Sequence, residues 1–201
     1  MKILFVMPKV GAWATHGIHR SPNQLYAHWA AYARERGYED VSVIDAKADQ
    51  IPMEELIEQV KIKNPDIVVM GEQLHGYGGY GVLRHFKEAA IGIKKALPKT
   101  KIILGGLWYS AMPVPTLEEN PAIDFVVMGE EESFGDLIEA IDKNKNLKDV
   151  GGVTSRVDGE IVMGPHKPLL EDLDKLPLPA YDLFPMNKYV GHTYWKPFVD
   201  M

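Results

Sequence analysis

Short apolar runs of strand length recur along the first two thirds of the chain, and longer amphipathic segments separate them. This alternation is typical of a parallel sheet with helices on both faces. We expect strands at residues 3–7, 41–46, 67–71, 101–104 and 123–128. We expect helices at residues 23–36, 53–63, 80–96, 114–120 and 131–143. Because crossovers between parallel strands are right-handed, the pattern predicts an α/β, Rossmann-like (flavodoxin-like) doubly wound five-stranded parallel sheet.

The pattern changes after this core. Residues 152–156 and 160–163 flank Asp158-Gly159, a dipeptide that favours a β-hairpin turn. Beyond them, prolines prevent long helices and predict an extended arm that wraps a surface; they are Pro165, Pro168, Pro177, Pro179, Pro185 and Pro197. We therefore expect a Rossmann-like domain at residues 1–149, a β-hairpin extension at 150–164 and a proline- and aromatic-rich arm at 165–201.

Composition excludes several function classes. The 201 residues contain no cysteine, which rules out a disulfide framework, a thiolate nucleophile and an iron–sulfur cluster ligated from within them. The net charge of −6, without any basic block, argues against nucleic acid as a partner. The first apolar run is too short for a signal peptide, and no later run has membrane-spanning length. We expect a cytoplasmic protein without a membrane span.

In an open α/β sheet, ligands bind outside the carboxyl ends of the strands. The segments that follow four strands, residues 8–20, 71–81, 105–112 and 129–133, are rich in glycine. Gly105-Gly106 would let a bulky ligand approach the backbone, or would simply form a tight turn. The acids after Gly129 either complement the start of a helix or contact a ligand.

Alternative functions remain open at this point. The segment from Gly76 to Gly81 contains G-x-G-x-x-G, as in an oxidoreductase that binds NAD or FAD, although the next strand ends in Gly105-Gly106 rather than in an acid. No pair of histidines has the spacing of a zinc site, so no metal ligand is assigned. His75 is a weak candidate because it follows the third strand, where it would face a ligand. A non-catalytic docking domain is the third alternative.

Six segments in order resemble the N-terminal cobalamin-binding domain of cobalamin-dependent radical S-adenosylmethionine (SAM) enzymes, a family with class B methyltransferases and enzymes like the anaerobic Mg-protoporphyrin monomethyl ester cyclase. These segments are residues 3–8, 43–46, 64–69, 103–106, 123–132 and 172–185. The last, with its repeated prolines, is the most specific, because a domain of this fold has no need of it. The resemblance covers nearly the whole chain.

The resemblance implies that cobalamin is the cofactor. The first loop lacks the Asp-x-His-x-x-Gly motif whose histidine ligates cobalt, which implies a base-off cofactor without a histidine ligand. Glu131 stands where the family often has glycine. The cofactor-binding residues that we expect are Pro8, Gly11, Trp13, Gly71, Glu72, Gln73, Leu74, His75, Gly76, Gly105, Gly106, Leu107, Trp108, Gly129, Glu130 and Glu131.

The resemblance also implies a larger enzyme. Residues 165–201 would lead towards a radical SAM barrel in the same full-length chain. That missing C-terminal part would bind S-adenosylmethionine and a four-iron four-sulfur cluster through its own cysteines. We expect these 201 residues to bind cobalamin without catalysing a reaction alone, and the full-length protein to perform methyl transfer or another radical reaction such as ring closure.

Overall fold

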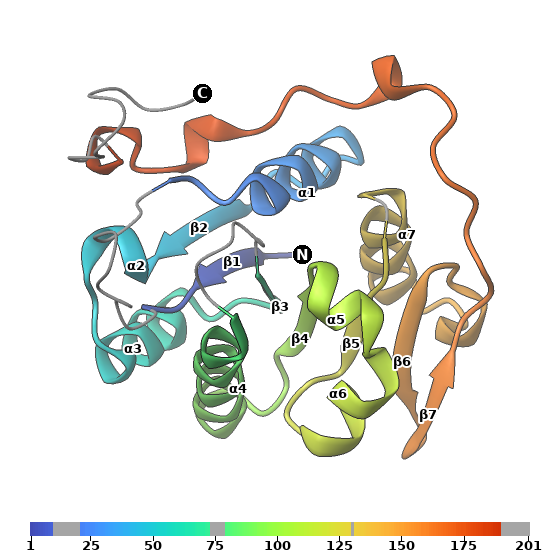
Figure 1. The fold of residues 1–201 in the computed structure, drawn as a ribbon, viewed down its shortest axis with the longest axis horizontal. Coiled ribbons are helices and arrows are strands. Elements are labelled where there is room, and N and C mark those ends of the chain that lie inside the picture. Colours follow the sequence, from blue (N-terminus) through green and yellow to red (C-terminus); the bar gives the residue numbers. More distant parts are fainter. Residues whose placement is uncertain (10–20, 73–78, 130, 190–201) are drawn as a thin grey trace.

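The computed structural model describes residues 1–9, 21–72, 79–129 and 131–189. At its centre lies one seven-stranded sheet with the order β2-β1-β3-β4-β5-β6-β7 (Figure 1). Five strands are parallel: β1 (Ile3–Met7), β2 (Val41–Asp45), β3 (Ile67–Gly71), β4 (Lys101–Gly105) and β5 (Phe125–Val127). The remaining two, β6 (Val153–Val157) and β7 (Glu160–Met163), are antiparallel.

Helices cover both faces of the sheet. The longer ones are α1 (Gln24–Glu35), α3 (Met53–Lys63), α4 (Gly79–Ala96) and α7 (Glu131–Asp142). Helix α1 contacts α7, and α3 contacts α4, so each face carries its own pair (Figure 1). Every residue of β1 and β3 is buried, because these strands lie in the middle of a sheet that is covered twice. The predicted doubly wound fold is confirmed.

The hairpin extends the same sheet. Strand β6 pairs antiparallel with β5, and β7 pairs with β6, so the sheet has seven strands where five were expected in the core. Asp158 and Gly159 both have positive φ angles, 53° and 85°, as the tight turn requires. The division of the chain at residues 149 and 164 stays a prediction.

Short helices lie where the sequence suggested a strand end and a loop. Helix α2 (Ala46–Asp49) begins at Ala46, which was expected to end a strand. The Asp45 carboxylate accepts a hydrogen bond from Ala48 N at 2.8 Å and so caps this turn. Helices α5 (Leu107–Ala111) and α6 (Pro113–Glu119) follow β4, so the expected loop at residues 105–112 is mostly helical.

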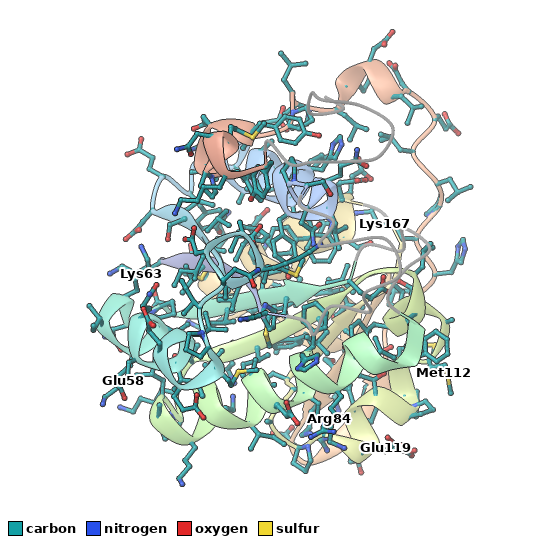
Figure 2. All side chains as sticks on the ribbon, turned by 60° about the vertical axis from the view of Figure 1, so that its left-hand side comes forward. Glu58, Lys63, Arg84, Met112, Glu119 and Lys167 are labelled. Atoms are coloured by element: carbon teal, nitrogen blue, oxygen red, sulfur yellow. The ribbon has the colours of Figure 1, made fainter. Side chains whose placement is uncertain are left out.

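The arm, residues 165–189, runs past α7 and crosses α1 (Figure 1). It contains only three short 3-10 turns: η2 (Leu173–Lys175), η3 (Tyr181–Leu183) and η4 (Met186–Lys188). Near its start, Lys167, labelled in Figure 2, pairs with Asp136 of α7. Further on, Asp182 pairs with Arg34 of α1 at 2.9 Å, and Ala180 N donates to Ala27 O at 2.9 Å.

The described part of the arm reaches the carboxyl edge of the sheet. The Tyr189 hydroxyl donates to Asp45 Oδ2 at 2.7 Å, and both residues are buried. The neighbouring Lys188 pairs with Asp49 of α2. The arm is therefore fixed to the last residue of β2 and to the helix that follows it. Among the helices of the described ranges, none has both the length and the apolar character that a membrane span requires.

Candidate ligand-binding edge

The carboxyl ends of the five parallel strands meet at one edge of the sheet, where ligands bind in this class of fold. Pairing of β1 with β2 continues to Met7 and Asp45, and pairing of β3 with β4 continues to Gly71 and Gly105. In contrast, pairing of β1 with β3 ends at Phe5 and Val69. We call the four residues beyond this point, Val6 and Met7 with Met70 and Gly71, the β1–β3 gap.

A tyrosine of α1 bridges the β1–β3 gap. The Tyr26 hydroxyl donates to Val6 O and accepts from Gly71 N, each at 2.8 Å. The Asn23 side-chain amide donates to Gly71 O at 3.2 Å. Both side chains are buried, and burial raises the pKa of Tyr26 well above its usual value. Sequence reasoning missed these residues, because an inward-facing tyrosine on a helix is indistinguishable from an ordinary core aromatic.

Three of the predicted glycines are required by the protein's own packing. A Cβ atom added to Gly105 would lie 2.2 Å from Cη2 of Trp29. One added to Gly71 would lie 2.7 Å from Gly105 O. Gly106 has a φ of +110°, and its Cβ would lie 2.5 Å from Glu72 O. The space on the Cβ side of these residues is therefore filled by other described residues, and the positive φ of Gly106 fits the tight-turn alternative. Contact of their backbone with a ligand stays a prediction.

Gly129 has a different environment. Its φ is +90°, and no described atom lies within 4 Å of the position a Cβ would take. The Ser110 hydroxyl connects it to the neighbouring strand end, because this oxygen donates to Gly106 O at 2.8 Å and accepts from Gly129 N at 3.4 Å. The segments after β4 and β5 are thus held together beside an open surface. Ser110 was also missed, because it lies in a stretch expected to be a loop.

Glu72 is a buried carboxyl group at the end of β3. Its Oε1 accepts a hydrogen bond from Trp108 N at 2.5 Å and caps the first turn of α5. Its Oε2 is buried and has no hydrogen-bond partner in the described part of the chain. Burial raises the pKa of this carboxyl group, and the hydrogen bonds from the backbone of Trp108 and Tyr109 oppose that shift.

The raised pKa of Glu72 predicts a pH-dependent stability. Because the folded state favours the protonated carboxyl, its stabilising contribution is present below the unfolded pKa of about 4 and is lost as pH rises through the folded pKa. Glu72→Gln removes this titration. We expect the free energy of unfolding of the variant, relative to wild type, to increase as the pH rises from about 4 to about 8. Chemical denaturation at each pH measures it.

The matched control is Glu54→Gln, which changes an exposed carboxyl group in the first turn of α3. A trend with pH that appears in Glu72→Gln and not in this control is then due to Glu72. If the difference in free energy of unfolding between Glu72→Gln and wild type stayed constant across this pH range, the raised pKa of Glu72 would be contradicted.

An exposed apolar surface lies beside this edge. Helix α5 and the residue after it present Leu107 at 68% exposure, Trp108 at 37% and Met112 at 44%. Met112 lies at the periphery of the molecule in Figure 2. The edge therefore combines backbone polar groups and a buried carboxyl with an apolar platform, which is what a broad amphipathic ligand needs.

The structure brings together part of the predicted site. Gly71, Glu72, Gly105, Gly106 and Trp108 lie in contact at the ends of β3 and β4, and Gly129 joins them through Ser110. Pro8 is buried just after β1, Leu107 begins α5, and Glu131 begins α7. The other predicted residues lie outside the described residues: Gly11, Trp13, Gln73, Leu74, His75, Gly76 and Glu130. Within the described ranges, no three His, Asp or Glu side chains are grouped as a metal site requires.

The fold is a doubly wound α/β domain, a class of fold in which ligands bind at the switch in strand order. Comparison with protein-family models then identifies the family to which this domain belongs. The model of the B12 binding domain matches residues 26–138, more than half of the chain, and the chain belongs to this family. The prediction that the chain is a B12-binding domain is confirmed.

Curated relatives are longer than this chain. An uncharacterized methyltransferase of Pyrococcus horikoshii is 31% identical over 192 residues, which cover 94% of this chain and 40% of the relative. The anaerobic magnesium-protoporphyrin IX monomethyl ester cyclase of Rubrivivax gelatinosus is 28% identical over 196 residues, which cover 94% of this chain and 34% of the cyclase. The chain thus spans 40% or less of the length of these two relatives.

Solved structures share the fold. The cobalamin-dependent SAM radical enzyme OxsB, with aqua-cobalamin and S-adenosylmethionine bound, gives a TM-score of 0.71 at 17% identity, over 94% of this chain and 25% of that one. The radical SAM methyltransferase TsrM of Kitasatospora setae, with cobalamin and a [4Fe-4S] cluster bound, gives a TM-score of 0.67 at 18% identity. The match covers 89% of this chain and 31% of that one. At these identities the likeness concerns the fold.

Proposed function

We propose that this chain is the cobalamin-binding module of a larger radical SAM enzyme and that it holds the cofactor base-off, without a histidine ligand. Membership of the B12-binding family carries the first part of this proposal. The first loop of the sequence, which lacks Asp-x-His-x-x-Gly, supports the second part. The names of the relatives, a methyltransferase and a cyclase, support methyl transfer or another radical reaction in the full-length protein.

The described residues fit a corrin, which has apolar faces and a rim of amides. The exposed side chains of Leu107, Trp108 and Met112 offer apolar cover. Gly129 leaves open space beside the ends of β4 and β5, so that a bulky group can approach its backbone. When bound, cobalamin would supply a cobalt ion that carries a methyl group or an electron.

The role of the chain itself would be to bind and orient. Glu72 holds the start of α5 through Trp108 N, and so fixes the apolar platform relative to β3. Ser110 fixes the segment after β5 relative to that after β4. We further propose that a radical SAM barrel in the same full-length chain covers this edge and binds S-adenosylmethionine and a four-iron four-sulfur cluster.

Cofactor uptake tests the proposal directly. The purified chain should bind hydroxocobalamin and methylcobalamin at micromolar concentration. After reduction to the cobalt(II) state, the electron paramagnetic resonance spectrum should show no splitting by a nitrogen nucleus, because neither histidine nor the cofactor's own base would ligate cobalt. Absence of binding at high micromolar cofactor would refute the module, whereas binding with a nitrogen splitting would refute only the base-off state without histidine.

A second titration separates the alternatives. NADH fluorescence should be unchanged by the chain if the segment from Gly76 to Gly81 is not a dinucleotide site. Saturable NADH binding without cobalamin binding would favour a dinucleotide-dependent oxidoreductase, and binding of neither ligand would favour a docking domain.

A further inference from the structure

Two polar contacts hold the described end of the arm at the carboxyl edge of the sheet. The Tyr189 hydroxyl donates to Asp45 Oδ2 at 2.7 Å, and Lys188 pairs with Asp49. Asp45 is the last residue of β2, and Asp49 is the last residue of α2. We call these four residues the arm latch. The latch connects the arm to the edge at which the proposed cofactor would bind.

Burial closes the latch together with these polar contacts. Tyr189 is buried, and so are Phe184 and Ala180, which precede it in the arm and belong to the same apolar core as β1 and β2. Opening the latch would expose the Tyr189 ring to water and leave the buried Asp45 Oδ2 without this donor. The closed and the open latch are therefore two distinct states, and a ligand that prefers one of them shifts the equilibrium between them.

Two contacts link the latch to the end of β1. Asp45 is paired with Met7 in the register of β1 and β2, and Met7 precedes Pro8, one of the predicted cofactor-binding residues. The other carboxylate oxygen of Asp45, Oδ1, caps α2, which follows β2 in Figure 1. The residue after this helix, Gln50, accepts a hydrogen bond from Lys9 Nζ at 3.5 Å through its backbone oxygen. The carboxylate that receives the arm thus also orders the helix that contacts Lys9.

We propose that Tyr189 is a positioning residue: the closed latch orders the end of β1 for cobalamin, so that cofactor binding and closure of the latch favour each other. This inference rests on the proposed function. The two equilibria are linked, so the factor by which closure raises the affinity for cobalamin equals the factor by which cobalamin favours closure. In the full-length protein, the position of the arm would then depend on whether the cofactor is bound.

Trypsin cleavage after Lys188 measures opening of the latch, because the closed latch pairs Lys188 with Asp49 and buries Tyr189 on the other side of the bond. Trypsin is kept dilute, so that the latch recloses faster than the chain is cut. At saturating hydroxocobalamin we expect this cleavage to slow by about fivefold or more. Cleavage after Lys175 is the matched control, because this lysine lies in the same arm with its side chain 74% exposed. Its rate should not change.

The reciprocal measurement is the affinity for cobalamin when the latch is open. Tyr189→Ala removes both the ring and the hydroxyl, so the dissociation constant for hydroxocobalamin should rise by the same factor, about fivefold or more. Tyr181→Ala is the control, since it makes the same truncation in the arm at a residue that packs against the core outside the latch. It should bind cobalamin as wild type does.

The cleavage measurement on wild type needs no variant and so decides the matter even if Tyr189→Ala does not fold. An unchanged rate after Lys188 at saturating cobalamin would overturn the coupling. Equal slowing after Lys188 and Lys175 would show a general stabilisation and would overturn the role of the latch. Wild-type affinity in a folded Tyr189→Ala variant would overturn Tyr189 as a positioning residue. If wild type bound no cobalamin, the proposed function would fail and this inference with it.

Discussion

Gly105→Ala is expected to lower the free energy of unfolding by about 3 kcal/mol, a large share of the stability of a domain of this size. The added Cβ would lie 2.2 Å from Cη2 of Trp29 and 3.0 Å from two further ring carbons. Trp29 has no room to move away, because it is buried and stacked on Phe134 with ring centroids 4.6 Å apart. Denaturant unfolding followed by circular dichroism measures the loss.

Two further variants show whether the tryptophan is the cause. Gly159→Ala strains a turn residue with a φ of +85° but meets no described atom within 4 Å, so it should cost only about 1–2 kcal/mol. Combining Gly105→Ala with Trp29→Phe should restore part of the stability that Gly105→Ala alone removes, because the smaller ring leaves space for the methyl group. If the double variant were no more stable than the sum of the two single changes predicts, the clash would not explain the loss.

Tyr189→Phe is expected to lower the free energy of unfolding by about 1–3 kcal/mol and to release the end of the arm. The change leaves Asp45 Oδ2 without its donor, at a residue that is only 4% exposed. Unfolding curves should report the stability, and limited proteolysis should cut residues 165–189 faster in the variant than in wild type.

The pH dependence of this variant has a definite sign. Burial raises the pKa of Asp45, while the hydrogen bonds from Ala48 N and from the Tyr189 hydroxyl lower it, so the tyrosine favours the ionised carboxylate. The loss caused by Tyr189→Phe should therefore be greatest well above the pKa of Asp45 in the fold and should shrink as the pH falls and Asp45 becomes protonated.

Tyr181→Phe is the matched control for the arm. Tyr181 lies in the same arm, its ring is tilted at 57° to that of Phe184, and its hydroxyl forms no hydrogen bond with the described residues. Stability and proteolysis of this variant should match wild type. If both tyrosine variants lost the same stability, the bond to Asp45 would not be what holds the arm.

Local patterns in the sequence were enough to predict the strands and the longer helices of the fold. The covered strands appear as unbroken apolar runs, because both of their faces are buried, and Asp158-Gly159 supplies the two residues that a tight hairpin tolerates at positive φ. Helix α5 was missed, because its first turn is capped by Glu72, which follows β3, rather than by a neighbour in the chain.

The candidate site depends more heavily on contacts between distant residues. The need for glycine at position 105 comes from Trp29 on α1, and the end of the β1–β3 ladder comes from Tyr26 on the same helix. A glycine pair after a strand looks the same whether protein or ligand fills the space beside it. At Gly129 no described atom fills that space, and close approach of a ligand to its backbone stays a prediction.

The contacts of the arm also constrain how the protein can fold. Asp182 meets Arg34 across 148 positions of sequence, and Tyr189 meets Asp45 across 144. Contacts between residues so far apart form late, because the chain loses most entropy in closing the longest loops. During synthesis, the sheet and α1 can assemble while the arm is still being made. Strand β2 lies at the outer edge of the sheet, and its contact with the arm would form late, because Tyr189 is translated long after Asp45.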